Sequence, residues 1–92
     1  MPAHPIATIH LTSHFKKSLK RLPRHIQEKA VERGALFRAD CFDPRLDTHR
    51  LGRELAGYWS YSVDYHYRVM FRFVSDHEVI YFDIGTHGIY KR

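Results

Sequence analysis

The sequence predicts an α+β domain in which two N-terminal helices pack on one face of an antiparallel sheet. Two patterns lead to this prediction. Apolar residues recur at helical spacing between residues 13 and 38, and they alternate with polar residues from Tyr58 to Ile84. Alternation with a period of two is typical of half-buried strands. A length of 92 residues, of which 43% are hydrophobic, suits one domain, 1–92, with a modest core.

The N-terminal part predicts one short strand and two helices. Residues 6–11 are rich in β-branched side chains, which favour a strand. Ser13 is the expected N-cap of the first helix, and Pro23 is expected to begin a second helix that ends near Arg38. The apolar stripe of the first helix consists of Phe15, Leu19 and Leu22. The residues that the second helix is expected to bury are Ile26, Ala30 and Phe37. Gly34 lies inside this helix at a cost of about 1 kcal/mol relative to alanine.

Three antiparallel strands are expected after a polar connection that starts at Asp43. They cover residues 58–64, 67–74 and 79–84, and short turns join them. In the central strand, Arg68 and Arg72 lie on the face opposite to the apolar residues. Antiparallel neighbours bring the end of one strand beside the start of the other. The segment after Ile84, in which Gly85 is expected to turn the chain off the sheet, should therefore reach Arg68.

The charge balance predicts an anionic partner. Fifteen Lys and Arg against ten Asp and Glu leave a net charge of +5, and eight histidines can add to it. Nucleic acid is the expected partner, and a charge kept for solubility alone is the alternative. Cys41 is the only cysteine, so the sequence offers no intrachain disulfide and a reducing cytoplasm is the expected location. No apolar run approaches the roughly 20 residues of a membrane span.

Five residues fit a metal-free cleavage of RNA. The ribose 2′-hydroxyl attacks the adjacent phosphorus when a base takes its proton, an acid protonates the leaving 5′-oxygen and cations stabilise the phosphorane. Histidine serves as base or acid, and arginine pairs with phosphate oxygens. The candidates are His49, His66, Arg68, His87 and Tyr90. A surface or turn position is the alternative for each histidine, and packing is the alternative for the tyrosine.

Neither a metal site nor a cysteine nucleophile is expected. His10 and His14 are four residues apart, with His4 nearby, but no acidic or cysteine partner follows at a spacing typical of a closed metal site. Cys41 lies in an apolar stretch that predicts the end of a helix. No cofactor is therefore expected.

Three segments carry a resemblance to a known family. They are FKKSLKRLP, FDPRLDTHRLGRELAGYWSYSVDYHYRVMFRF and IGTHGIYK, and together they cover most of the chain. The pattern resembles bacterial type II toxins of the RelE/ParE superfamily, nearest to RelE/YafQ-like mRNA interferases. The resemblance implies a β-α-α-β-β-β fold, a cognate antitoxin as partner and cleavage of mRNA in the decoding site of the ribosome. A ParE-like inhibitor of DNA gyrase and a fold without an active site are the alternatives.

The resemblance also implies roles for individual residues. The histidine of the GTH motif falls on His87, the histidine of the preceding loop on His49, the arginine of the YR pair on Arg68, and a terminal aromatic on Tyr90. We expect His87 to act as general acid or base, and His49 or His66 to take the complementary role. Arg68 is expected to stabilise charge on the scissile phosphate. The residues expected to bind ribosomal RNA and mRNA are Lys16, Lys17, Lys20, Arg21, Arg72, Lys91 and Arg92. A solvated helix face is the alternative for the first four.

Overall fold

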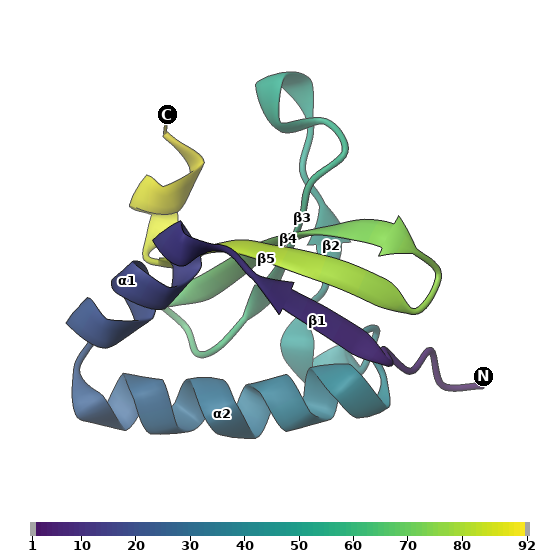
Figure 1. Ribbon diagram of the computed structural model, residues 1–92, viewed down its shortest axis with the longest axis horizontal. Coiled ribbons are helices and arrows are strands. Elements are labelled where there is room, and N and C mark those ends of the chain that lie inside the picture. Colours follow the sequence, from purple (N-terminus) through teal and green to yellow (C-terminus); the bar gives the residue numbers. More distant parts are fainter. Residues whose placement is uncertain (1, 92) are drawn as a thin grey trace.

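The computed structural model describes residues 2–91 and has a five-stranded mixed sheet with two helices (Figure 1). The order of the strands across the sheet is β1-β5-β4-β3-β2. The helices and strands are β1 (Thr8–Leu11), α1 (Ser13–Arg21), α2 (Arg24–Ala39), β2 (His49–Arg50), β3 (Trp59–Ser62), β4 (Arg68–Ser75) and β5 (Glu78–Gly85). Three short 3₁₀ turns complete the order, η1 (Pro44–Leu46), η2 (Arg53–Leu55) and η3 (His87–Tyr90). The predicted α+β class, with two N-terminal helices and a β3-β4-β5 meander, is confirmed.

The sheet differs from the prediction in two respects. β1 pairs in parallel with β5, so that Ile9 lies opposite Val79, whereas the other neighbours are antiparallel. Parallel neighbours need a long connection, and the whole chain from α1 to β4 separates β1 from β5. The second difference is β2, a two-residue strand that His49 and Arg50 form within the predicted connection and that pairs with β3.

The N-terminus of α1 is capped by Thr12, which corrects the predicted N-cap, Ser13. Thr12 has extended backbone angles (φ −71°, ψ 159°), as an N-cap requires, whereas Ser13 is already helical. Thr12 Oγ1 accepts a hydrogen bond from the backbone N–H of Phe15 (3.0 Å) and donates one to the backbone oxygen of Phe82 on β5 (3.2 Å). These two bonds tie the start of α1, including His14, to the C-terminal half of β5.

α2 follows α1 almost at once and is continuous, as predicted. Pro23 is its N-cap, and the helix runs through Gly34 without a break. Ile26 and Phe37 are buried, and Ala30 packs half-buried against the same core. Neither α2 nor any other helix within residues 2–91 is both long and apolar enough to cross a membrane.

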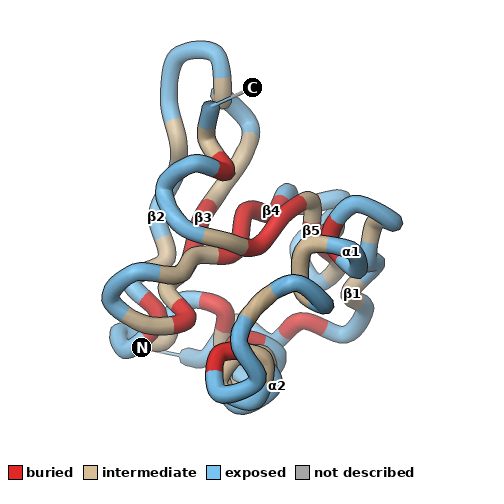
Figure 2. Tube along the Cα trace, turned by 90° about the vertical axis from the view of Figure 1, so that its left-hand side faces the viewer, coloured by how far each residue is buried: buried red, intermediate tan, exposed pale blue. Residues whose placement is uncertain are grey.

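Aromatic side chains fill the core between α2 and the sheet. The ring centroid of Phe37 lies 4.7 Å from that of Tyr61 and 4.9 Å from that of Phe71, separations typical of favourable aromatic pairs. Tyr61 Oη donates to Tyr81 Oη (3.0 Å), and burial raises the pKa of both phenols. Figure 2 shows that buried residues gather along β4, the middle strand of the sheet.

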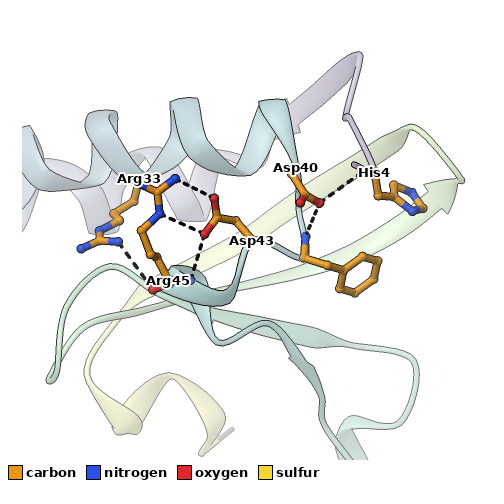
Figure 3. Close-up of polar contacts among 6 residues, drawn as sticks. His4, Arg33, Asp40, Asp43 and Arg45 are labelled. Carbon is orange, nitrogen blue, oxygen red and sulfur yellow. Dashed lines mark hydrogen bonds and ion pairs between the residues drawn. The ribbon is translucent and has the colours of Figure 1, made fainter. Parts of the chain in front are cut away.

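Two aspartates hold the connection between α2 and β2 (Figure 3). Asp40 accepts hydrogen bonds from the backbone N–H groups of His4 (3.1 Å) and Phe42 (3.0 Å). Asp43 accepts two bonds from the guanidinium of Arg45, from Nε at 3.0 Å and from Nη2 at 2.7 Å. These bonds lower the pKa of Asp43 to about 2. They fix the path by which the chain approaches β2.

Candidate active site

The sheet face that points away from α2 carries polar residues from four strands. Directly opposite residues on neighbouring strands share a face of the sheet. One row across the sheet, from β2 to β5, consists of His49, Ser60, Met70 and Asp83. A second row, two residues along, consists of Ser62, Arg68 and Gly85. We call the side of the sheet that carries these two rows the open face; in the first row His49 is exposed, whereas Ser60, Met70 and Asp83 are buried. In Figure 1 it is the upper face of the sheet, with α2 below and the yellow C-terminal turn above.

Arg68 lies at the centre of the open face and is held there by two side chains. Its Nη1 donates to Ser62 Oγ, and the same atom lies 4.0 Å from a carboxylate oxygen of Asp47. The Arg68 side chain is 17% exposed, so its guanidinium is held in place but remains reachable. Asp47 has a left-handed backbone (φ 51°), a conformation in which aspartate is enriched. A positive group positioned in this way needs little reorganisation before it meets an anion.

The C-terminal turn η3 packs onto β5 at Gly85. Ile89 is buried there, and a Cβ atom at position 85 would lie only 2.8 Å from Ile89 Cγ2. Gly85 has no left-handed backbone angle, so the glycine is required for space. This corrects the expectation that it serves to turn the chain. Gly85 pairs with Arg68, so the prediction that the end of the last strand reaches this arginine is confirmed.

Tyr90 reaches from η3 across the open face, and His87 lies beside it. The Tyr90 hydroxyl forms a hydrogen bond with Ser60 Oγ (2.5 Å), which links the C-terminal turn to β3. The exposed His87 ring lies edge-on to the Tyr90 ring, with 5.9 Å between the centroids. The structure therefore brings Tyr90 and His87 to the end of the sheet at which Arg68 lies.

The other two predicted histidines occupy different positions. His49 lies in the first row, and its Nδ1 is 2.8 Å from the backbone oxygen of Asp47. Because a carbonyl oxygen only accepts, Nδ1 donates this bond and Nε2 is the acceptor of the neutral ring. His66 is exposed in the turn between β3 and β4, where its ring lies against Tyr65. His66 has no place in either row, so of these two only His49 belongs to the open face.

The predicted RNA-binding residues are exposed wherever the structure describes them. The exposed residues are Lys16, Lys17, Lys20 and Arg21 on α1, Arg72 on β4 and Lys91 after η3. On α1 these cations share the helix surface that lies away from the buried Phe15. Arg72 lies on the same side of the sheet as Arg68, as strand alternation predicted. Arg92 lies outside the described residues.

A histidine–carboxylate pair beside the open face was not predicted. His14 Nε2 lies 3.1 Å from Asp83 Oδ2, and the Asp83 side chain is only 7% exposed whereas that of His14 is 53% exposed. Asp83 Oδ1 accepts a hydrogen bond from the backbone N–H of Ile84 (2.9 Å). The feature of the sequence that could have indicated this pair is Asp83, an aspartate inside the apolar run VIYFDI. Its partner was not apparent because His14 comes from α1, far away in the sequence.

His14 lines two hollows in the surface. The η2 hollow, about 430 Å³, is lined by Thr12, His14, Glu54, Tyr58, Met70 and Phe82 among others. The η3 hollow, about 500 Å³, is lined by His14, Arg21, Asp83, Gly85, Thr86 and Lys91 among others. Within residues 2–91, no three His, Cys, Asp or Glu side chains are placed to hold a metal ion together.

Solved structures of bacterial toxins share this architecture. A chain of the RelBE2 toxin–antitoxin complex from Mycobacterium tuberculosis has a TM-score of 0.75 and 25% sequence identity, with 90% of this chain and 93% of that chain covered. The YoeB/ParE toxin from Agrobacterium tumefaciens has a TM-score of 0.73 and 18% identity, with 88% and 99% covered. The chain therefore has the fold of the RelE superfamily of toxins, and the resemblance of its sequence motifs to that superfamily is confirmed.

Within that superfamily, the YafQ branch to which the motifs point is also represented. A chain of the DinJ–YafQ toxin–antitoxin complex from E. coli has a TM-score of 0.72 and 16% identity, with 91% of this chain and 96% of that chain covered. At this identity the likeness concerns the fold alone. No family model matches the sequence, and the comparison with curated protein sequences finds no match.

Proposed function

We propose that this chain is the toxin of a type II toxin–antitoxin system and that it cleaves mRNA on the ribosome. The observation that carries the proposal is the arrangement at the end of β5. Arg68 is fixed opposite Gly85, and η3 folds back so that Tyr90 and His87 lie at the same end of the sheet. The comparison structures support the class of protein, since two of them are toxin–antitoxin complexes.

The proposed reaction uses the ribose of the substrate as its nucleophile. A base takes the proton of the 2′-hydroxyl, O2′ forms a bond to phosphorus, and the bond from phosphorus to O5′ breaks. An acid gives its proton to O5′, so the products carry a 2′,3′-cyclic phosphate and a 5′-hydroxyl. Arg68 pairs with the non-bridging oxygens as negative charge builds up on them. His87 is one of the two groups that transfer protons, and each such group contributes roughly 10²- to 10⁴-fold in rate.

Tyr90 positions the substrate and the turn η3 in this proposal. Its hydroxyl is engaged by Ser60, so the phenol stays fixed above the open face and its ring can stack on a nucleobase. Stacking of this kind contributes about 1–3 kcal/mol per base. The bond to Ser60 also holds η3, and therefore His87, at the site.

The proposed partners follow from charge and from the comparison structures. The exposed cations of α1 bind phosphates of ribosomal RNA, which places the open face against the mRNA. A cognate antitoxin is the proposed protein partner, because toxins of this fold are found in complexes with one. With the ribosome and an antitoxin as partners, the proposed location is the cytoplasm.

The test is primer extension on a defined mRNA incubated with the purified protein, with and without programmed ribosomes. We expect cleavage only when ribosomes are present, and its loss in His87→Ala. The variant should keep the wild-type melting temperature, because the His87 side chain is exposed. His66→Ala is the matched control, because its exposed histidine lies in neither row of the open face, and it should cleave like the wild type.

Two outcomes would contradict the proposal. Cleavage by His87→Ala at the wild-type rate would remove His87 from the mechanism. No cleavage by the wild type under either condition would remove the nuclease activity and favour the alternative, a ParE-like inhibitor of DNA gyrase. Inhibition of gyrase-dependent supercoiling by the same preparation would then decide for that alternative.

A further inference from the structure

We infer that the η2 hollow binds one nucleobase of the mRNA beside the cleaved bond and that Glu54 selects guanine as this base. The inference rests on the proposed function and deepens it, because it assigns the base that the nuclease reads. Three observations carry it: the aromatic side chains in the hollow, the carboxylate that lines it and its position relative to Arg68.

Two aromatic rings from different parts of the sheet meet in the η2 hollow. Tyr58, which directly precedes β3, and Phe82 on β5 both line it, and their ring centroids lie 5.2 Å apart at an interplanar angle of 81°. In such an edge-to-face pair, the ring that points its edge at the other keeps both of its own faces clear of its partner. Both residues are half-buried, so a planar base can still reach them. Nucleobases stack on aromatic side chains of this kind.

A β-bulge sets the position of Phe82. The residues on either side of it pair with Met70 and Phe71 of β4, so Phe82 is an extra residue of β5 in the ladder. Its carbonyl oxygen accepts the hydrogen bond from Thr12 Oγ1 (3.2 Å), which holds the bulge against the start of α1. Bulges redirect side chains and are frequent next to active sites. The backbone therefore fixes this ring in the hollow beside Met70.

Of the described residues that line the hollow, only Glu54 is acidic. It belongs to η2, which in Figure 1 lies above the sheet on the same side as the C-terminal turn. Backbone hydrogen bonds from Leu55 to Gly52 and from Ala56 to Arg53, both 3.0 Å, close the turn around it. The backbone of Glu54 is thus held in place, and its exposed side chain is free to meet the edge of a base that stacks on the rings.

A carboxylate in this position selects guanine among the four bases. It only accepts hydrogen bonds, and its two oxygens accept two bonds side by side. Proteins read the Watson–Crick edges of bases in single-stranded RNA, and guanine has two adjacent donors there, N1–H and the N2 amino group. Adenine and cytosine have one amino group next to an acceptor nitrogen, and uracil has one N–H between two carbonyl oxygens. Each of these three bases would therefore set an acceptor against the carboxylate.

The position of the hollow brings the base next to the cleaved bond. Met70, which lines the hollow, lies between Arg68 and Arg72 along the open face of β4. Successive residues on one face of a strand are about 7 Å apart. A nucleotide with its base in the hollow thus has its phosphates within reach of the arginines, whereas Glu54 repels phosphate. The ring of Tyr90 remains available for the base on the other side of the cleaved bond.

The first experiment measures the base preference of cleavage. Messages that differ in one nucleotide, directly before or directly after the cleaved bond, have guanosine, inosine or adenosine there. Inosine keeps N1–H but lacks the 2-amino group. At one of the two positions, the wild type should cleave the guanosine message with a kcat/KM about 5- to 150-fold above that of the adenosine message, the range of one bidentate contact, with inosine in between. Equal values for the three messages at both positions would overturn the inference.

The second experiment asks whether Glu54 sets this preference. The amide in Glu54→Gln presents one acceptor and one donor, which match the N6 amino group and N1 of adenine instead of the two donors of guanine. The variant should therefore cleave the adenosine message better than the guanosine message. Glu32→Gln, which removes an exposed carboxylate from α2, is the matched control and should keep the preference for guanosine. Any preference that the ribosome imposes is common to all these proteins, so an unchanged preference in Glu54→Gln would overturn the inference.

The aromatic pair is tested separately. Tyr58→Leu should lower kcat/KM on the three messages by similar factors, because stacking tolerates every base. Tyr65→Leu is the control, since this ring is 85% exposed in the turn between β3 and β4, and it should match the wild type. Both variants are assayed below their melting temperatures. Wild-type kcat/KM values for Tyr58→Leu on all messages would show that no base stacks in the hollow and would overturn the inference.

The proposed function and this inference fail in different ways. A wild-type protein that cleaves nothing would overturn the nuclease proposal, and the inference would fall with it. A wild-type protein that cleaves all three messages equally well would leave the nuclease in place and overturn the inference alone.

Discussion

Arg68 owes its place in the site to a short row of partners on neighbouring strands. Ser62 lies opposite it on β3 and Gly85 opposite it on β5. The serine accepts a hydrogen bond from the guanidinium, and the glycine leaves room for the turn that carries His87. A change at this one position therefore removes a positive charge that is already positioned where phosphate charge develops.

Arg68→Ala should lower the rate of mRNA cleavage by about 10²- to 10³-fold, the loss typical of removing one positioned group that stabilises the transition state. The measurement is single-turnover cleavage at saturating enzyme. Arg72→Ala, on the same strand and side of the sheet but exposed, should change binding and leave the single-turnover rate within a few-fold of the wild type. Equal losses in the two variants would show that overall charge, and not the position of Arg68, matters.

Asp43 makes the stability of the fold depend on acid pH. The guanidinium of Arg45 lowers the pKa of Asp43 from 3.8 to about 2 in the folded state. A carboxyl group whose pKa is lower in the folded state stabilises the fold at pH values above its pKa in the unfolded state. This contribution is lost as the pH falls through the pKa of the folded state. In urea titrations, Asp43→Asn should thus be less stable than the wild type above about pH 4. The difference should shrink toward pH 2, and a constant difference across that range would contradict the assignment.

At the scale of elements, η3 depends on the close approach of Ile89 to β5. Gly85→Ala would place a Cβ atom 2.8 Å from Ile89 Cγ2, and overpacking of this kind costs about 1–3 kcal/mol. We expect a lower melting temperature and weaker cleavage, because η3 carries His87. Gly88→Ala is the matched control, since the nearest atom to its added Cβ, Thr86 Oγ1, lies at 4.0 Å.

Removal of the clash between residues 85 and 89 should restore the packing of η3 on β5. Adding Ile89→Ala to Gly85→Ala removes the clashing atom, so the double variant should be no less stable than Ile89→Ala alone. Thermal unfolding of the wild type, the two single variants and the double variant measures the coupling between positions 85 and 89. Strictly additive losses would mean that Gly85 is not needed for the packing of η3.

The helices and the meander could be predicted because their signals are local. The stripe on α1, the proline before α2 and the alternation in β3, β4 and β5 each arise within a few residues. The parallel pairing of β1 with β5 joins segments far apart in the sequence, and β2 is too short to show a period. The position of Thr12 as N-cap depends on backbone angles that either of two neighbouring residues could have adopted.

The site could be predicted only in part, for the same reason. The position of Arg68 opposite the end of β5 follows from the order of three consecutive strands, so it could be predicted. The pairing of His14 with Asp83 depends on how α1 is tied to β5 through Thr12, which no local pattern reveals. The sequence also predicts His66 as a site residue, because a histidine in a turn and a histidine in a site have the same appearance in a sequence.

At the scale of the whole molecule, the exposed cations of α1 should govern association with the ribosome. Charge reversal at Lys17 and Lys20, both exposed on α1, should weaken ribosome binding and flatten the dependence of log Kd on log salt by about one unit for each lost phosphate contact. Sedimentation binding across a salt series measures this slope. Reversal of Arg24 and Lys29 on α2 to glutamate lowers the net charge by the same amount and serves as the control for net charge alone. An unchanged slope in the α1 variant would favour a merely solvated helix face.

The measurement that most directly tests the account is cleavage of an mRNA in which one nucleotide lacks its 2′-hydroxyl. The deoxy sugar is placed at the position where the unmodified message is cut on programmed ribosomes. We predict that cleavage there disappears, while the unmodified message yields ends with a 2′,3′-cyclic phosphate and a 5′-hydroxyl. Undiminished cleavage at the deoxy position would mean that water is the nucleophile, and the acid–base mechanism on the open face would be wrong.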